Sequence, residues 1–430
     1  MSFDEIKKSV LNAIDESREE IISIGEEIFK NPELGYFEEK TSAFVRSVFD
    51  KYSIEYTYPH AVTGVKAKLT NGNGPNIVII GEMDALKCPK HPSSNKDGNA
   101  HACGHHAQIA AMLGAAIGFA KSEAVKSLSG SVTFFAVPAE EFIDLDARRT
   151  LKNEGKIKYS GGKQQLLYEG AFDDADIAIM LHAQPDEPDR KVYVRGYNLG
   201  FLAKTITFCG KTAHGSTPFD ATNALNAAAL AILGIHSNRE TFRDEDRIRI
   251  HPIITKGGDV VNSVPDEVVI DTYVRGATLE AIKKGNNAVE RSVKGAAQMI
   301  GATANTEDFP GYLPLCESNE LNDVFEAVVA EISGKDSLVY GEPITGSTDM
   351  GDLSSLIPSI QPSIGGFSGK LHSEKFEVAD AETAYILAAK LLAATVCDLL
   401  SGGGKKAYDV IKAYKGVMNK EEYIKYLKGE

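Results

Sequence analysis

Four short runs of residues in this sequence are apolar at every position or nearly so. They are residues 77–80, 132–137, 177–181 and, less strongly, 360–364. A strand that is buried on both faces has this pattern, because helices cover both sides of a parallel sheet. Helical patterns lie between several of the runs. We therefore predict an α/β fold with a mostly parallel sheet.

Each of these runs is followed by a side chain that can bind a metal or carry a proton. Asp84 follows the first run, and Glu140 and Glu141 follow the second. His182 follows the third run, and His372 follows the fourth after a glycine-rich turn. In open α/β sheets the ligand site lies outside the carboxyl ends of the strands. We expect these residues to converge at one edge of the sheet.

The densest group of potential ligands is the segment His101-Ala102-Cys103-Gly104-His105. Thiolate and imidazole are preferred zinc ligands, and a glycine between them lets the backbone turn both toward one ion. A structural zinc knuckle or a polar loop without metal is the alternative. A structural site usually takes four Cys/His ligands from two nearby pairs, and the sequence has no second pair. The segment favours a functional metal site.

The adjacent carboxylates of Glu140 and Glu141 would repel each other after a buried strand unless something neutralised them. A metal pair does so if one glutamate binds metal and its neighbour removes a proton from a bound water, whose pKa falls from about 15.7 to about 7. The alternative is a solvated loop end. Asp84 is a candidate to orient a ligating imidazole, or an ordinary helix start. The metallohydrolase hypothesis depends on all these residues following strands together.

Residues 200–310 have a different pattern. Their expected order is β-α-β-β-α-β, which is the split, ferredoxin-like arrangement. Its elements are a strand at 203–209, a helix at 222–236, strands at 247–255 and 268–274, a helix at 279–300 and a strand near 303. We predict an inserted α+β domain at 200–310 and a discontinuous catalytic, metal-binding domain at 1–199 and 311–430.

Three residues of the inserted segment are candidates for substrate binding. His214 lies in a glycine-flanked loop, Asn262 lies in a turn-like stretch, and Arg275 lies at a strand end. Together they could bind a carboxylate and polarise a scissile carbonyl. Taken singly, they are equally typical of a loop cap, a turn former and a surface cation.

Composition narrows the class of partner. The chain has 60 acidic residues against 46 basic ones and a formal net charge of -14, which does not favour nucleic acid. The polar N-terminus has no signal-peptide pattern, and the longest stretch of small apolar residues, 107–120, is too short to span a membrane. Five cysteines without paired spacing indicate reduced thiols. We expect a cytoplasmic protein without a membrane or nucleic-acid partner.

Taken together, these segments resemble the aminoacylase and glutamate carboxypeptidase family of cocatalytic metallopeptidases. The resemblance is greatest to the amidohydrolase branch that contains auxin-conjugate hydrolases and p-aminobenzoyl-glutamate hydrolases. It covers most of the chain, from residues 31–35 through 83–86, 101–105, 138–141, 213–214, 262–266 and Arg275 to 371–372.

The resemblance implies a zinc-exopeptidase-like catalytic domain and a ferredoxin-like lid that forms a homodimer. It implies two divalent ions, zinc or manganese, with Cys103 bridging them and with Cys103, His105, Glu141, His182 and His372 as ligands. Glu140 matches the general base of the family. His214 matches a lid histidine that reaches the partner subunit's site and stabilises the oxyanion. Asn262 and Arg275 match positions that hold the substrate's carbonyl and carboxylate.

The chain departs from the branch in three places. His106 and Gln108 stand where an aspartate and a histidine are common, and residues 346–352 are more similar to the aminobenzoyl-glutamate and dipeptidase side. An apparent insertion at 142–160 directly follows the two glutamates. Substrate specificity is therefore less constrained by the resemblance than the chemistry is.

We predict a metal-dependent amidohydrolase that cleaves an N-acyl or aminoacyl amino acid, with Glu140 as the base. One alternative is a dipeptidase that needs a free substrate amine, for which Asp144 or Asp146 would be the acidic partner. Another is a catalytically silent metal- or ligand-binding protein that keeps the fold. None of the expected ligands is missing from the sequence, which disfavours the silent protein.

Overall fold

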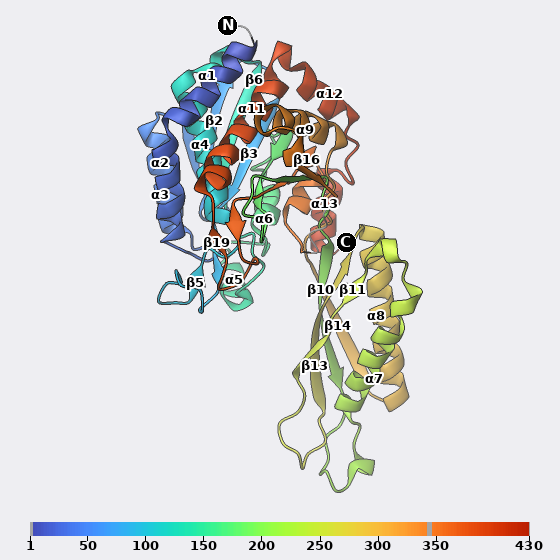
Figure 1. Ribbon diagram of the computed structural model, residues 1–430. Helices are drawn as coiled ribbons and strands as arrows, with labels where there is room; N and C mark the ends of the chain where they lie inside the picture. Colours follow the sequence, from blue (N-terminus) through green and yellow to red (C-terminus); the bar gives the residue numbers. More distant parts are fainter. Residues whose placement is uncertain (1–2, 342–345, 430) are drawn as a thin grey trace. The chain divides into compact units, whose positions relative to one another are not determined.

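The computed structural model describes residues 3–341 and 346–429 (Figure 1). The chain divides into two compact units. Unit 1 takes the described residues of Met1–Gly196, Cys316–Pro343 and Asp352–Met418, and unit 2 takes those of Tyr197–Leu315, Ile344–Gly351 and Asn419–Glu430. The longest segment of unit 2, Tyr197–Leu315, begins and ends close to the predicted boundaries after 199 and 310. Unit 2 also takes two segments that the sequence prediction assigned to the catalytic domain.

Unit 1 contains a six-stranded sheet in the order β1-β2-β6-β3-β7-β16. β3 pairs in parallel with both β6 and β7, and β16 pairs in parallel with β7, whereas β1 and β2 form an antiparallel edge. The predicted α/β class with a mostly parallel sheet is confirmed. The strands are Tyr56–His60 (β1), Gly64–Asn71 (β2), Asn76–Glu82 (β3), Gly130–Val137 (β6), Ile177–Ile179 (β7) and Ser359–Ile360 (β16).

The apolar runs form the centre of this sheet because they are buried on both faces. Every residue of β3 and of β6 is buried. The run 360–364 is shared between two sheets, and the run 177–181 ends directly before a strand of the second sheet. After β7 the chain forms β8, and after β16 it forms β17. Both of these strands belong to a four-stranded sheet of order β15-β9-β17-β8. Its strands are His182–Ala183 (β8), Val192–Val194 (β9), Leu338–Tyr340 (β15) and Ser363–Ile364 (β17).

A proline explains the break in the last run. Pro362 lies between β16 and β17, and proline cannot donate a hydrogen bond to a sheet ladder. Its carbonyl accepts a hydrogen bond from the backbone nitrogen of His182 at 2.9 Å. The change of sheet therefore fixes His182 where the central strands end.

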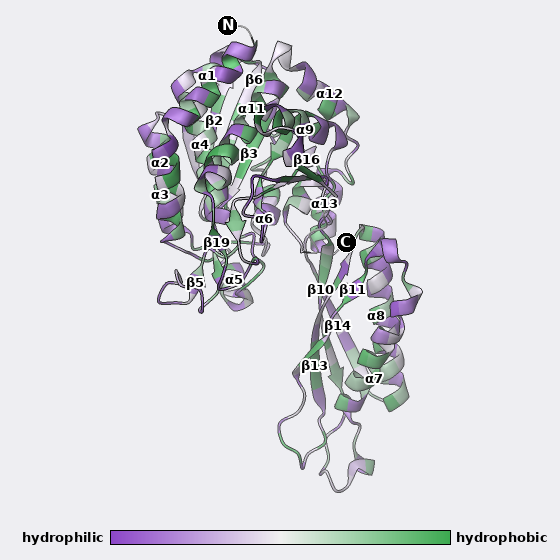
Figure 2. Ribbon diagram, viewed as in Figure 1, coloured by the Kyte–Doolittle hydropathy of each residue, from purple (hydrophilic) through white to green (hydrophobic). Residues whose placement is uncertain are grey.

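The helix α4 (His105–Ser122) is the centre of the helical layer. It is buried from His105 to Phe119 and packs against β3, while α1 (Phe3–Glu16), α2 (Arg18–Phe29) and α11 (Ala388–Leu400) pack against it (Figure 1). Apolar residues concentrate on α4, α11 and β3 (Figure 2). α4 begins at the predicted metal ligand His105, so the packing of α4 in the core fixes the position of this ligand.

One apolar helix was missed by the sequence analysis. The stretch Glu382–Leu400 is long and apolar enough to cross a membrane by length and composition, but 94% of its most apolar window is buried inside the protein. It consists of a π-helical turn, Glu382–Leu387, and α11. Its composition is that of a core helix.

All five cysteines are free.

Shorter elements complete the described part of unit 1. The helices are Glu39–Lys51 (α3), Leu145–Asn153 (α5), Gly162–Glu169 (α6), Asn319–Ser333 (α9), Met350–Ser354 (α10, which begins in unit 2) and Lys405–Ala413 (α12). The paired short strands are Leu86–Lys87 (β4) with Asn99–Ala100 (β5), and Phe367–Ser368 (β18) with Glu377–Val378 (β19).

The chain order of unit 2 is β-α-β-β-β-α-β, which has one strand more than the sequence predicts, because the predicted strand at 247–255 is divided into Arg249–Ile250 and Ile253–Lys256. Its antiparallel sheet has the order β11-β13-β10-β14, with β12 also paired to β13. The elements are Gly200–Cys209 (β10), Ala224–Ser237 (α7), Arg249–Ile250 (β11), Ile253–Lys256 (β12), Glu267–Gly276 (β13), Leu279–Ile300 (α8) and Thr303–Pro310 (β14), with Lys420–Lys428 (α13) at the end of the chain. Its role as a lid stays a prediction.

The helices α7 and α8 cover one face of this sheet. Ile206 and Phe208 of β10 and Val268, Ile270 and Val274 of β13 are buried with them in one apolar cluster. Buried and half-buried residues alternate along β13, because successive side chains of a strand point to opposite faces. The face opposite the helices therefore carries residues such as Tyr273 and Arg275.

The surroundings of two helical glycines differ, so we expect opposite effects of the same glycine-to-alanine substitution on stability. A Cβ added at Gly118 in α4 would lie 2.6 Å from Cγ1 of Ile14 in α1, whereas one added at Gly295 in α8 meets no atom within 4 Å. We expect Gly118→Ala to lower the free energy of unfolding by about 1–3 kcal/mol through overpacking. Gly295→Ala should raise it by about 1 kcal/mol, the difference in helix propensity. Urea denaturation measures both, and a gain in both variants would contradict the described contact of α1 with α4.

Candidate metal centre

The predicted ligands of unit 1 lie where its central strands end. β3 ends two residues before Asp84, β6 ends three residues before Glu140, and β8 begins at His182. Parallel strands have their carboxyl ends at one edge of a sheet. The site therefore combines residues that are distant in the sequence.

Two groups of three donor atoms share the thiol of Cys103. The first group is Cys103, His105 and His182, and the second is Cys103, Glu141 and His372. Within each group all donor atoms lie within 4.8 Å of one another. The structure thus brings together all five predicted ligands. One sulfur common to two groups is the arrangement of a paired centre with a bridging ligand.

Individual distances show how compact the cluster is. The sulfur of Cys103 lies 3.7 Å from Nε2 of His182, and Nε2 of His372 lies 3.1 Å from Oε1 of Glu141. The side chain of His372 is 53% exposed and that of Glu141 is 9% exposed. His105 is completely buried. The cluster therefore has a buried side at His105 and an open side at His372.

Gly104 allows the two neighbouring ligands to join the same group. Its φ is +87°, in the left-handed region that favours glycine. A Cβ at this position would lie 2.5 Å from the Cβ of Ala183, which follows His182. The glycine therefore supplies both the turn between Cys103 and His105 and the close approach to β8.

Backbone carbonyls fix which ring nitrogen of two histidines faces the cluster. Nδ1 of His105 lies 2.8 Å from the carbonyl oxygen of Asp84, and Nδ1 of His182 lies 2.9 Å from that of Ala183. A nitrogen that donates to a carbonyl carries the proton, which leaves the lone pair of Nε2 for a metal.

Asp84 contacts two of the candidate ligands, which is the geometry that a residue orienting a ligand would have. It is completely buried. Its Oδ2 accepts a hydrogen bond from the backbone nitrogen of Glu141 at 2.9 Å, and its Oδ1 lies 3.3 Å from Nδ1 of His105. Asp84 thus connects ligands that follow two different strands.

The charges of the cluster depend on one another. Burial disfavours ionisation of Cys103, but the charge of His105 and hydrogen bonds from His105, His182 and His372 hold the pKa of the thiol well below its usual value. Hydrogen bonds to Cys103 and Glu141 raise the pKa of His372 to about 10. Burial and the charge of Cys103 raise the pKa of Glu141 to about 7. The anionic ligands need positive charge beside them, which imidazolium protons or a metal can supply.

Two atoms of the cluster test whether a metal fits. Nε2 of His105 and Oε1 of Glu141 are buried and form no well-aligned hydrogen bond among the described residues, although Oε2 of Glu82 and Nε2 of His372 lie 3.2 and 3.1 Å from them. Buried polar atoms are rarely left in this state. Thiolate, imidazole and carboxylate are the donor types that zinc binds in proteins. The residues present therefore fit a divalent transition metal.

Comparison with known proteins identifies the family. The profile of Peptidase family M20/M25/M40 matches residues 78–396, a range that contains both donor groups. The chain belongs to this family. It is accordingly a hydrolase of amide or peptide C–N bonds, as the sequence predicts.

Individual relatives extend the match along the chain. An IAA-amino acid hydrolase ILR1-like 4 of Arabidopsis thaliana is 26% identical over 353 residues, which cover 79% of this chain and 75% of that protein. A Xaa-Arg dipeptidase of Mus musculus is 25% identical over 423 residues, which cover 92% of this chain and 89% of that protein.

Solved structures show the same fold. A putative aminohydrolase of methicillin-resistant Staphylococcus aureus superposes with a TM-score of 0.79 at 22% identity, covering 92% of this chain and 100% of that one. The YXEP protein of Bacillus subtilis, described as a dinuclear metal-binding peptidase of the M20 family, gives a TM-score of 0.73 at 23% identity, covering 90% and 99%.

Sequence reasoning missed Glu82, the last residue of β3. Its Oε2 lies 3.2 Å from Nε2 of His105, and Glu82, His105 and Glu140 form a third group of donor atoms within 4.8 Å. Burial disfavours its charge, but Lys163, whose Nζ lies 2.6 Å from Oε1, and His105 keep the pKa of Glu82 below its usual value. Two acids two residues apart at the end of an apolar run were a readable signal. Lys163 offered none.

Gln108 holds the side chain and the backbone of Glu82 through two hydrogen bonds. It donates a hydrogen bond from Nε2 to Oε2 of Glu82 at 2.9 Å, and its Oε1 accepts one from the backbone nitrogen of Glu82 at 3.2 Å. His106, the other departure from the branch, is buried against Phe29 with ring centroids 4.8 Å apart. Burial and neighbouring histidines hold the pKa of His106 well below its usual value. Neither residue belongs to the donor groups.

The backbone that carries Glu140 and Glu141 is held from two sides. Oε1 of Glu38 accepts a hydrogen bond from the nitrogen of Ala139 at 2.9 Å. Burial and repulsion from Asp84 raise the pKa of Glu38 to about 8. A Cβ at Gly162, the first residue of α6, would lie 1.6 Å from the carbonyl oxygen of Pro138. The two glutamates therefore have a rigid support that the sequence pattern did not reveal.

The insertion 142–160 lies beside the site, as expected. Arg148 in α5 is buried and donates hydrogen bonds to the carbonyl oxygen of Glu141 and, at 2.6 Å, to that of Ser160. Asp144 caps α5 by accepting from the nitrogen of Ala147 at 3.4 Å, and Asp146 pairs with Arg149 at 2.9 Å. The two acids considered for a free substrate amine both have local partners.

The three candidates in unit 2 divide into two places. The backbone of Gly215, next to His214, donates to the carbonyl oxygen of Asn262 at 2.7 Å, and His214 forms an isolated bridge with Ser263. These two loops lie beyond the pairing of Cys209 with Glu267, whereas Arg275 pairs with Phe201 at the other end of the sheet. At about 3.4 Å per residue, that separation along β13 is roughly 25 Å.

Asp84→Asn tests the support of the ligands. Asparagine keeps the size of the side chain but removes the charge beside His105. We expect the affinity for zinc to fall by about 10–100-fold, as for other residues that orient metal ligands. Titration against a fluorescent chelator measures this. Asp97→Asn, in an exposed loop, is the matched control, and equal affinities in the two variants would contradict the role of Asp84.

Proposed function

We propose that this M20 hydrolase is a two-metal amidohydrolase that cleaves the bond between an acyl or aminoacyl group and an amino acid with a free carboxylate. The observation that carries the proposal is the sharing of Cys103 by two donor groups. A second feature supports it, because Glu140 lies directly beside the shared cluster, with Oε2 4.0 Å from Nε2 of His105.

The proposed ligands are Cys103, His105, Glu141, His182 and His372. Two zinc or manganese ions held there would polarise the substrate carbonyl and lower the pKa of a bound water to about 7. Asp84 would keep His105 and Glu141 in position through its hydrogen bonds.

Glu140 is the proposed general base. It takes a proton from the attacking water and returns it to the nitrogen of the leaving amine. Its backbone follows Ala139, whose amide is fixed by Glu38, so the carboxylate stays beside the ligands. The neighbouring Glu141 would hold a metal ion and would then not be free to act as the base.

The relatives support an amide substrate. The names of two of them describe an IAA-amino acid hydrolase and a Xaa-Arg dipeptidase, so both are named for amides of an amino acid. Between these chemistries, the local partners of Asp144 and Asp146 disfavour the recognition of a free substrate amine. An N-acyl amino acid is therefore the preferred substrate class.

The predicted cytoplasmic location stays a proposal.

We infer a homodimer, and the separation of the unit 2 residues supports this inference. A small acyl-amino acid cannot contact Arg275 and His214 of one chain if they are roughly 25 Å apart. We infer that Arg275 binds the substrate carboxylate, and that His214 and Asn262, which stabilise the oxyanion and hold the carbonyl, come from the partner subunit. Isologous contact between two copies is the commonest way to provide this.

Glu140→Gln tests the mechanism. We expect kcat to fall by about 10²–10⁴-fold, the usual contribution of a general base, while both metal ions remain bound. The assay panel contains N-acetyl amino acids, aminobenzoyl-glutamate and free dipeptides, each with zinc, with manganese and with chelator. Chelator should abolish all turnover. Glu19→Gln, an exposed acid of α2, is the control, and full activity of Glu140→Gln with bound metal would disprove the mechanism.

Complementation tests the dimer. Glu140→Gln and His214→Ala should each be inactive as homodimers. In a mixed dimer, one site would combine a normal Glu140 with the normal His214 of the other chain. Random mixing should therefore restore about one quarter of the wild-type activity. Absence of recovery, with mixed dimers demonstrated by mass spectrometry, would mean that His214 does not act across the interface.

A further inference from the structure

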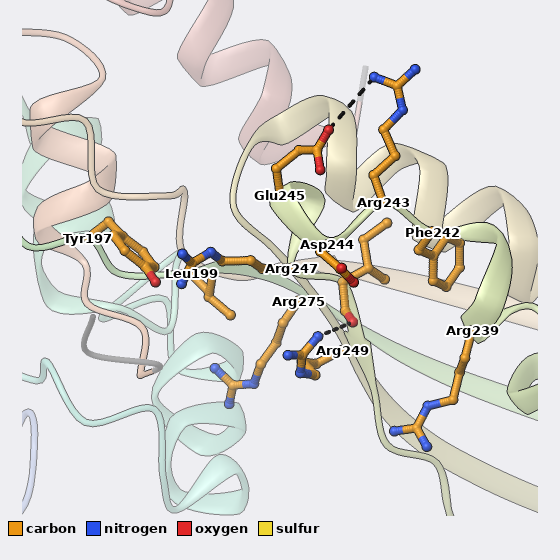
Figure 3. A pocket seen from close by; sticks show the side chains of 11 residues that line it. Tyr197, Leu199, Arg239, Phe242, Arg243, Asp244, Glu245, Arg247, Arg249 and Arg275 are labelled. Carbon is orange, nitrogen blue, oxygen red and sulfur yellow. Dashed lines mark hydrogen bonds and ion pairs between the residues drawn. The ribbon is translucent and has the colours of Figure 1, made fainter. Parts of the chain in front are cut away.

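One arginine of unit 1 is almost completely buried, which sets it apart from the other arginines that the structure describes. Arg148 in α5 is 2% exposed. By contrast, the five arginines that line a cavity of about 910 Å³ in unit 2 are half-buried or exposed (Figure 3). An arginine side chain stays charged in proteins, and burying a charge is costly unless its surroundings compensate it. The contacts of Arg148 must therefore supply this compensation.

Arg148 joins the two ends of the insertion that follows the catalytic-strand glutamates. Its guanidinium donates to the carbonyl oxygen of Glu141, directly before the insertion, and at 2.6 Å to that of Ser160, the last residue of the insertion. Its Cζ lies 5.6 Å from the ring centroid of Tyr36 and 5.7 Å from that of Phe142. Carbonyl oxygens and aromatic faces both stabilise a guanidinium. These contacts compensate the buried charge and close the insertion at its base.

The contact with Arg148 completes the fixation of the Glu141 backbone. The nitrogen of Glu141 donates to Oδ2 of Asp84 at 2.9 Å. The carbonyl oxygen of Glu141 accepts from the guanidinium of Arg148 and, at 2.8 Å, from the nitrogen of Ile143. The peptide groups on both sides of the Glu141 Cα are thus held. The direction in which the carboxylate leaves the backbone is fixed before any ion binds, as a precise metal site requires.

Glu141 belongs to only one of the two donor groups. The outer donor group is Cys103, Glu141 and His372, and the inner donor group is Cys103, His105 and His182. A loss of precision at Glu141 should therefore weaken the binding of an ion by the outer donor group and spare the inner one.

We propose that Arg148 is a positioning residue that holds Glu141 in place for the ion of the outer donor group. The insertion then belongs to the metal centre. The inference rests on the proposed function, because it requires that both donor groups hold ions. Asp84 differs from Arg148, since it contacts His105 of the inner donor group as well as Glu141. Loss of Arg148 should weaken one ion, whereas loss of Asp84 should weaken both.

Arg148→Gln and Arg149→Gln form the matched pair of variants. Both remove a positive charge from α5, but the side chain of Arg149 is 71% exposed and pairs with Asp146. Zinc is titrated into the metal-free proteins in competition with a fluorescent chelator. We expect Arg148→Gln to bind the ion of the outer donor group about 10–100-fold more weakly and the inner ion unchanged. Arg149→Gln should bind both ions as the wild-type protein does.

Two ligand variants identify the affected ion. His372→Ala removes a ligand of the outer donor group only, and His182→Ala removes one of the inner donor group only. The titration of Arg148→Gln should resemble that of His372→Ala. Equal weakening of both ions, or a resemblance to His182→Ala, would overturn the inference, because a general loss of stability does not select one donor group.

Arg148→Lys separates the role of geometry from that of charge, and it replaces Arg148→Gln if that variant does not fold. Lysine keeps the charge, but its ammonium group lacks the planar fork that spans two carbonyl oxygens. We expect a loss that is confined to the outer ion and is smaller than that of Arg148→Gln. Wild-type affinity for the outer ion in Arg148→Lys would show that charge alone matters, and the positioning role would be wrong.

Hydrogen exchange of the metal-free protein provides a measurement that needs no ion. The backbone amides of residues 139–143 should exchange at least about ten-fold faster in Arg148→Gln than in Arg149→Gln, since a buried hydrogen bond from a charged group is lost. The amides of residues 101–105 should exchange equally in both variants. Equal exchange at 139–143 would contradict the fixation of Glu141 by Arg148.

The outcomes separate this inference from the proposed function. Two ions in the wild-type protein and an unchanged outer ion in Arg148→Gln would refute the role of Arg148 and leave the amidohydrolase intact. Fewer than two ions in the wild-type protein would refute the two-metal centre, while hydrogen exchange would still decide whether Arg148 fixes the backbone of Glu141.

Discussion

The structure of unit 1 depends on the confinement of negative charge where the central strands end. The thiol of Cys103 and the carboxylates of Glu82, Asp84 and Glu141 are buried within one small region. Such groups repel one another, and burial penalises each of them. Only positive charge makes the arrangement stable, and the chain supplies part of it through Lys163. The remaining positive charge comes from protonated imidazoles, or from a bound metal ion that takes the place of those protons.

Topology explains why the sequence places Asp84, Glu140 and Glu141 at one edge of the sheet, whereas the full set of ligands is what the family resemblance implies. Once 77–80 and 132–137 are recognised as parallel, buried strands, the residues that follow them must share an edge. The supporting charges do not obey such a rule. Lys163 lies in a helix with no distinctive pattern, and Glu38 precedes another. Their importance comes from what they contact across the fold, which periodicity does not encode.

Unit 2 shows a related limit of sequence reasoning. Strand and helix order follows from alternation and helical spacing, and the predicted β-α-β-β-α-β order is present except that the strand at 247–255 is divided into β11 and β12. Function depends on register, which places Arg275 opposite Phe201 and Arg249 but places His214 and Asn262 beyond the other end of the same sheet. The sequence treats these residues as one set of substrate contacts. The antiparallel pairing separates them, and this separation is the reason to assign them to different copies.

The unequal exposure of the candidate ligands has a consequence for how the protein gains and loses metal. His372 is 53% exposed, whereas His105 is completely buried. An ion between Glu141 and His372 would exchange with solution directly. An ion held by His105 and His182 would exchange more slowly, because His105 is completely buried and His182 is 9% exposed. The two positions would therefore differ in how fast they gain and lose metal when metal is scarce.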